Sequence, residues 1–242
     1  MKTIKLLLCI VLLALGSTAK AQFANSTTAA GTGQKSLSAI VTNDCSNYNR
    51  FNFSYSTLKL SYYGIEDTYP GFRFGWTGGY SVVETAPFFV ETGIDFSFNT
   101  KVHEETKSYK SKSSTASLIV PLQLAYKLSF QNGAYISPYT GFHFKVNVLG
   151  KDTDTYNGET ESDNWFDNDE TEENDWDDYW YDEEETSEVY RRFQMGWRIG
   201  GNIGYKAFNF NVGYMLDFIP LCKDGGDKTK TSSVHVGIGI NF

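Results

Sequence analysis

The last nine residues of the chain, Val234 to Phe242, read VHVGIGINF. Every second residue of this stretch is large and apolar, and the residues between them are small or polar. This period-two alternation predicts a β-strand with one apolar face. What the apolar row contacts depends on the rest of the chain.

The same alternation predicts seven further strands, beginning near residues 51, 71, 88, 117, 134, 189 and 208. In the first of them the apolar row shifts by one residue near Thr57, which indicates a β-bulge. The opposite faces are polar and carry charges on strand after strand. These charged residues are Arg73, Glu91, Asp95, Lys127, Lys145, Arg192, Arg198 and Asp217.

Eight strands with this many large apolar residues would fill more core than one soluble sandwich can hold. An apolar face turned towards lipid, with a polar and charge-paired interior, avoids that difficulty. A sheet in lipid must close, because open edges would leave backbone groups unpaired. We therefore predict an all-β fold, an eight-stranded antiparallel up-and-down transmembrane β-barrel, over residues 50–242. Alternating long and short connections, at 63–70, 99–114 and 150–188 against short turns, predict periplasmic termini.

The start of the chain has the features of a signal peptide. Lys2 and Lys5 precede a short apolar run at residues 6–15, and small residues stand at positions 19 and 21. The run is shorter than the ~20 apolar residues of a spanning helix. We expect residues 1–21 to be removed and residues 22–49 to form a periplasmic amino-terminal tail.

Two cysteines, Cys45 and Cys222, remain after this removal, in an oxidising compartment. The predicted topology places them on opposite sides of a hydrocarbon layer of ~30 Å. Because bridged Cα atoms lie within ~7 Å of each other, we expect no disulfide between them.

The segment 150–188 is unusually acidic. Residues 152–188 hold 18 of the 29 acidic residues and no lysine or arginine. The rest of the mature chain has 18 basic residues (21 minus three in the leader) and 11 acidic ones (29 minus 18), a net charge of +7. The charge asymmetry therefore belongs to one predicted extracellular loop.

Three interpretations of this loop remain open. Its charge repulsion favours a solvated loop without a specific role. Its carboxylates, among them Asp152, Asp154, Asp167 and Asp169, could bind Ca²⁺ weakly, although the spacing does not match an EF-hand. Its aromatic residues, including Trp165, Trp176 and Trp180, could contact a partner.

Four segments resemble the outer membrane protein β-barrel domain family of Bacteroides-type bacteria. They are APFFVETGIDFSF (86–98), LIVPLQLAYKL (118–128), ISPYTGFHFKV (136–146) and GIGINF (237–242). The end of the chain also resembles the carboxy-terminal signal of outer-membrane barrels. The resemblance implies a barrel integral to the Gram-negative outer membrane, with membrane lipid around it and the barrel-assembly machinery as its partner during insertion. It implies no catalytic motif and does not cover the acidic segment.

The sequence offers no clear chemistry. It has no phosphate loop, dinucleotide fingerprint or Cys/His metal spacing, and His103, His143 and His235 are far apart. We therefore expect a protein that is not an enzyme, with no catalytic residues, no cofactor apart from weakly bound Ca²⁺, and no nucleic-acid partner. The predicted role is structural or a surface interaction with an unknown extracellular partner. The alternatives are a narrow pore for small solutes and a membrane-embedded surface hydrolase. The interior of an eight-stranded barrel is just wide enough for side chains to fill, which favours a charge-paired plug over a pore.

Overall fold

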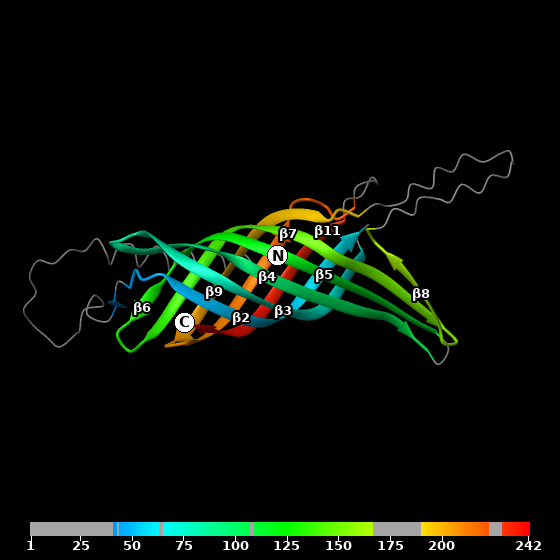
Figure 1. Ribbon diagram of the computed structural model, residues 1–242, viewed down its shortest axis with the longest axis horizontal. Coiled ribbons are helices and arrows are strands. Elements are labelled where there is room, and N and C mark those ends of the chain that lie inside the picture. The colour runs from blue at the N-terminus through cyan, green and yellow to red at the C-terminus, as the bar shows by residue number, and fades with distance from the viewer. Residues whose placement is uncertain (1–40, 43, 63–64, 107–108, 167–189, 223–228) are drawn as a thin grey trace, which may run out of the picture.

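The computed structural model describes residues 41–42, 44–62, 65–106, 109–166, 190–222 and 229–242. Nearly all of them lie in strands of one antiparallel sheet (Figure 1). The strands are β1 (Val41–Thr42), β2 (Tyr48–Tyr62), β3 (Ile65–Val83), β4 (Ala86–Glu105), β5 (Tyr109–Tyr126), β6 (Leu128–Phe130), β7 (Ala134–Tyr156), β8 (Glu159–Asn164), β9 (Phe193–Tyr205), β10 (Phe208–Asp217) and β11 (Lys230–Asn241).

Eight of these strands form a closed ring. The hydrogen-bonded order is β2, β3, β4, β5, β7, β9, β10 and β11, and β11 pairs back onto β2. Beyond the last paired strand residue, Phe242 and Asn49 exchange two backbone hydrogen bonds of 3.0 and 3.2 Å. The chain end thus closes the ring, which confirms the predicted eight-stranded barrel.

The barrel has an apolar outside and a polar inside. Its exposed large side chains are rows of phenylalanine, valine, isoleucine and leucine on all eight strands of the ring, whereas most of its buried side chains are polar or charged. This is the distribution of a transmembrane barrel, whose outer face contacts lipid. No helix in the described ranges is long and apolar enough to cross a bilayer.

The bulge predicted near Thr57 is wrong. The register of β2 runs unbroken past Thr57 against both of its neighbours. Leu58, Leu60 and Tyr62 therefore share the inward face of the buried residue Ser56. The register shifts of the ring lie elsewhere, at Ser81/Val83, Val102/Glu104 and Ala116/Ser117.

The two ends of the barrel differ. At one end, residues 84–85, 131–133 and 206–207 make tight connections. At the other end, β4, β5 and β7 extend past the ring, and β7 continues through a turn at Asn157–Gly158 into β8 (Figure 1). Both turn residues have positive φ, which glycine adopts without strain and asparagine tolerates.

These extensions correct the predicted connections. Most of residues 63–70 and 99–114 are strand, and so are residues 150–156 and 159–164 of the acidic segment. Alternation missed them because their outer faces are polar. Residues 167–188 lie outside the described ranges.

Towards the amino-terminus, residues 1–40 lie outside the described ranges, so the signal peptide and the first part of the tail remain predictions. Within the predicted tail, β1 pairs with β6, and β2 begins at Tyr48. Cys45 and Cys222 are not joined by a disulfide in the described part of the chain.

Candidate functional site

The candidate site is the polar interior of the barrel, where seven buried side chains of the described residues have a formal charge at neutral pH. They are Arg50, Arg73, Glu91, Asp95, Lys145, Arg198 and Asp217. Each strand of the ring turns every second side chain inward. Six different strands of the ring contribute these charged residues. They form three clusters along the barrel axis.

Glu91 is the centre of the first cluster, nearest the tight turns. Its carboxylate is fully buried and accepts hydrogen bonds from Tyr48, from Gln123 and from Arg50 Nη2 at 3.1 Å. The Tyr48 ring also packs edge-on against Phe89, with ring centroids 5.1 Å apart. The cluster therefore combines a satisfied buried charge with a small apolar contact.

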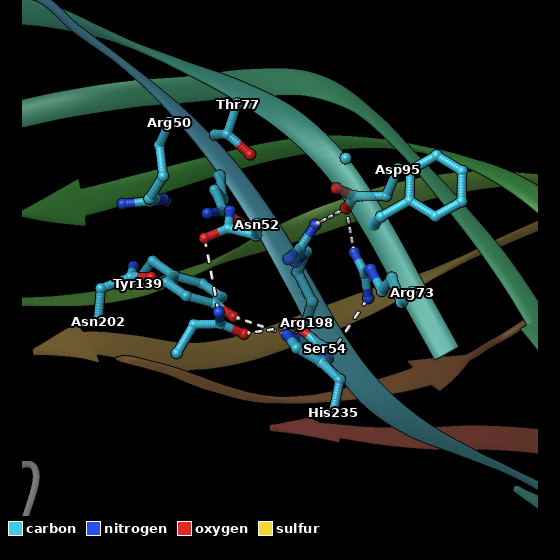
Figure 2. Close-up of a pocket in the computed structure, with 14 residues that line it drawn as sticks. Arg50, Asn52, Ser54, Arg73, Thr77, Asp95, Tyr139, Arg198, Asn202 and His235 are labelled. Atoms are coloured by element: carbon cyan, nitrogen blue, oxygen red, sulfur yellow. Dashed lines mark hydrogen bonds and ion pairs between the residues drawn. The ribbon is translucent and has the colours of Figure 1, made fainter. Parts of the chain in front are cut away.

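Asp95 is the centre of the middle cluster (Figure 2). Arg73 makes an ion pair with its Oδ2 atom, and Arg198 Nη1 lies 3.5 Å from the same atom. His235 lies between the Tyr139 hydroxyl, at 3.3 Å, and Arg73 Nη1, at 3.4 Å. One carboxylate thus faces two guanidinium groups.

Asp217 is the centre of the third cluster, nearest the extended strands. Lys145 and Thr231 donate hydrogen bonds to its Oδ2 atom, and His143 Nε2 lies 2.6 Å from Oδ1. Gln194 connects this cluster to its surroundings through a 3.0 Å hydrogen bond to Thr231. Buried charges are tolerated when they are paired in this way.

Among the described residues, the interior has a small cavity and a larger one. The middle cluster borders one of about 20 Å³, and a larger one of about 370 Å³ opens at the end with the tight turns. Arg50 lines both. The smaller volume accommodates roughly one water-sized particle.

A salt bridge connects the tail to the mouth of the larger cavity. Lys127 Nζ lies 2.9 Å from Asp44 Oδ2, and Ser46 donates two hydrogen bonds to the other oxygen of Asp44. Partial burial opposes ionisation, but the hydrogen bonds from Ser46 and Lys127 outweigh it and lower the pKa of the Asp44 carboxyl. Ionised Asp44 therefore helps to hold this segment at the mouth.

Six of the eight charged residues expected on the inward faces are buried there. Lys127 lies at the mouth instead, and Arg192 precedes β9 and is exposed, with its guanidinium 4.9 Å from the Phe166 ring. Sequence reasoning missed Arg50, because the first predicted strand began one residue later, at Phe51. Arg50 directly precedes Phe51, whose side chain faces outward. That position was the signal in the sequence for an inward-facing side chain at residue 50.

The described residues predicted to bind a cation or a partner already have protein partners. Asp152 Oδ2 accepts a 2.7 Å hydrogen bond from the Trp165 indole, and Asp154 accepts one of 3.1 Å from Tyr109. The Trp165 ring stacks on Tyr190, with centroids 5.1 Å apart. Across the described ranges, no three His, Cys, Asp or Glu side chains are grouped to hold a metal. Asp167, Asp169, Trp176 and Trp180 lie outside those ranges.

One serine–histidine contact lies beyond the interior clusters. His103 Nε2 is 2.7 Å from Ser113 Oγ, and the His103 ring meets the Tyr69 ring edge-on, with centroids 6.0 Å apart. A nucleophile and a base within hydrogen-bond reach are two of the three parts of a catalytic triad. His143 and His235 lie in the buried clusters, so the three histidines are not brought together.

The comparison with protein families agrees with this architecture. A family model described as "Outer membrane protein beta-barrel domain" matches residues 46–222, which is most of the chain. The chain belongs to this family. The resemblance found in the sequence is thereby confirmed, and this member of the family is an integral β-barrel of the Gram-negative outer membrane.

Solved outer-membrane barrels are also similar. The attachment invasion locus protein Ail of Yersinia pestis has 12% identity and a TM-score of 0.45, covering 81% of this chain and 99% of that one. The corresponding values are 14%, 0.38, 81% and 97% for Neisserial surface protein A, and 9%, 0.34, 83% and 98% for OprG from Pseudomonas aeruginosa. No curated protein matches the chain significantly in sequence.

The lengths of the connections bear on which end of the barrel faces the periplasm. Outer-membrane barrels have short periplasmic turns and longer extracellular connections. We therefore propose that the tight turns, Phe242 and the larger cavity are periplasmic, and that the extended strands with β8 are extracellular.

Proposed function

We propose that this barrel is not an enzyme, that it does not conduct solutes, and that it displays an acidic sheet at the cell surface for interaction with a cationic partner. The observation that supports this proposal best is the extension of β4, β5 and β7 together with β8, at the end of the barrel that we assign to the cell exterior. The extension reaches past the ring, so lipid contact does not account for it.

The charge of the extension indicates the kind of partner. Asp152 lies opposite Asp163, and Asp154 lies opposite Glu161, across the β7–β8 pair. Directly opposed residues point to the same side of a sheet, so these four carboxylates share one face. Like charges in this arrangement repel each other, and a cationic surface would relieve the repulsion. Segment 167–188 adds further acidic residues next to this sheet in the sequence.

The interior supports a closed barrel. Within the described residues, the three clusters occupy the lumen; the cavity at the middle cluster is about 20 Å³, and the larger one of about 370 Å³ lies at the end with the tight turns. An eight-stranded barrel has an interior just wide enough for such side chains. A salt-bridged plug therefore fits these side chains better than a pore.

Proximity labelling on intact cells tests the surface role. The triple variant E159Q/E161Q/D163N should lose specific surface neighbours, because it removes the charges of β8 while keeping side-chain size. The matched control is E66Q, which removes an exposed carboxylate on β3. Equal labelling by the parent protein, the triple variant and E66Q would argue against a role for the β8 charges.

Two assays separate the alternatives. In planar bilayers the purified barrel should show no steady conductance, and a stable ohmic conductance would favour the narrow pore. The contact between His103 and Ser113 makes a surface hydrolase the other candidate. Lipid or peptide turnover that disappears in both S113A and H103A would favour that enzyme over our proposal.

A further inference from the structure

The charges buried in the described part of the barrel do not balance. Four cationic residues (Arg50, Arg73, Lys145 and Arg198) face three anionic ones (Glu91, Asp95 and Asp217), a net charge of +1 with both buried histidines neutral. Lys145 pairs with Asp217 and Arg50 with Glu91. The excess therefore belongs to the middle cluster, where Asp95 alone faces Arg73 and Arg198.

The middle cluster also has buried donors without an acceptor. Arg50 Nε, Arg198 Nε and Nη1, and Asn202 Nδ2 have no hydrogen-bond partner, although each residue is at least nine-tenths buried. Arg198 Nη1 is within 3.5 Å of Asp95 but makes no hydrogen bond to it. All three residues line the cavity of about 20 Å³. In Figure 2, Arg50 and Asn202 lie on the side of Arg198 away from Arg73.

A buried donor without a partner destabilises the fold, and an uncompensated buried charge destabilises it more. A water molecule in the cavity would accept hydrogen bonds from some of the donors, but it would leave the excess positive charge uncompensated. A small monovalent anion would satisfy the donors and neutralise the charge as well. Sulfate and phosphate are excluded by size, because the cavity holds roughly one water-sized particle.

We infer that the barrel holds one small monovalent anion of the halide class, such as chloride, between Arg50, Arg198 and Asn202. Asp95 also lines the cavity, but its Oδ2 atom faces Arg73 and Arg198. The guanidinium Nε atoms of Arg50 and Arg198 therefore remain available to the anion.

The periplasmic cavity offers a route of entry. Arg50 lines it as well as the smaller cavity, and Lys127 and Lys206 also line it. Positive side chains at a narrow opening raise the local concentration of anions. The ion would then be loaded from the periplasmic side or during folding.

Thermal unfolding of the purified barrel in detergent tests this inference. Chloride is varied against gluconate at constant sodium concentration and ionic strength, and unfolding is followed by the loss of heat-modifiable gel mobility. The midpoint should rise with the logarithm of chloride concentration, by about 3–6 °C per tenfold increase above the dissociation constant. Bromide should act in the same way.

Two variants and one control separate the site from general salt effects. R198M removes the excess charge and two of the four donors without a partner, and N202L fills the cavity while leaving every charge in place. Both should lose the chloride dependence. K59M, which removes an exposed lysine on β2, should keep it. Equal midpoints in chloride and gluconate for the parent protein, or an unchanged dependence in R198M and N202L, would overturn the inference.

A direct measurement needs no variant. Crystals grown in sodium bromide should give one anomalous peak between Arg50, Arg198 and Asn202. Water density there without an anomalous peak would overturn the inference, even if neither variant folded.

Discussion

Replacing Glu91 with glutamine should destabilise the barrel strongly. Glu91 is 0% exposed and accepts hydrogen bonds from Tyr48, Arg50 and Gln123. The substitution keeps the shape of the side chain but leaves the Arg50 guanidinium buried without its counter-ion. Breaking a buried pair from one side costs about 3–5 kcal/mol, and we expect E91Q to lose that much free energy of unfolding.

A double variant and an exposed pair set the scale. R50M/E91Q removes both charges, so it should recover a large part of the loss, as buried pairs often do when both partners are replaced. Lys59 and Glu66 form a 2.6 Å pair whose side chains are 41% and 58% exposed. E66Q should therefore cost only about 0–1 kcal/mol.

Urea titration of the barrel in lipid vesicles measures these differences. Tryptophan fluorescence and heat-modifiable gel mobility report unfolding, and the chloride concentration is held constant. A loss below about 1 kcal/mol for E91Q, equal to that of E66Q, would mean that water solvates Arg50. That result would refute the closed interior and favour the pore.

The remaining predictions concern chain closure, topology and pH. Deleting Phe242 removes its backbone hydrogen bonds to Asn49 and an aromatic side chain of the lipid-facing belt; barrel assembly should slow, measured as the time course of heat-modifiable mobility. A membrane-impermeant maleimide should label S162C on intact cells, whereas Cys45 should react only after the outer membrane is permeabilised. Because the folded-state pKa of Asp44 is lowered, its contribution is present at neutral pH and is lost as pH falls through that lowered value; protease cleavage near residue 44 should accelerate there, and D44N should show no such pH dependence.

Much of the fold could be predicted because one physical constraint applies to every strand. In lipid the outer face must be apolar and the backbone must be paired, so alternation assigns faces and closure assigns the neighbour of the last strand. On β7, for example, Phe142 and Val146 face outward while His143 and Lys145 are buried, as predicted. The same constraint predicted most of the interior charges.

That constraint weakens at the edges of the lipid-facing belt. The side chains of Leu58, Leu60 and Tyr62 face the interior, so the apolar row changes from the outer to the inner face without a change of register. In the sequence, this change of face has the same pattern as a one-residue slip. The extracellular parts of β4, β5, β7 and β8 have no apolar face, so their polar sequences were taken for loops. The cation excess also escaped prediction, because it depends on Arg50, at a strand boundary, and on which residues share Asp95.

The extracellular hairpin supports the proposed surface role on energetic grounds. The opposed carboxylates of β7 and β8, Asp152 with Asp163 and Asp154 with Glu161, destabilise the hairpin, since directly opposed like charges do so in sheets. Neighbouring contacts offset this: β5 pairs with β7 along its outer half, and Trp165 donates a hydrogen bond to Asp152. A cationic partner would neutralise these carboxylates, and the relief of their mutual repulsion would add to the binding free energy. Because these charges are exposed, the gain should fall with added salt over a screening length of ~8 Å at physiological ionic strength, whereas contacts made by Trp165 or Phe166 should not.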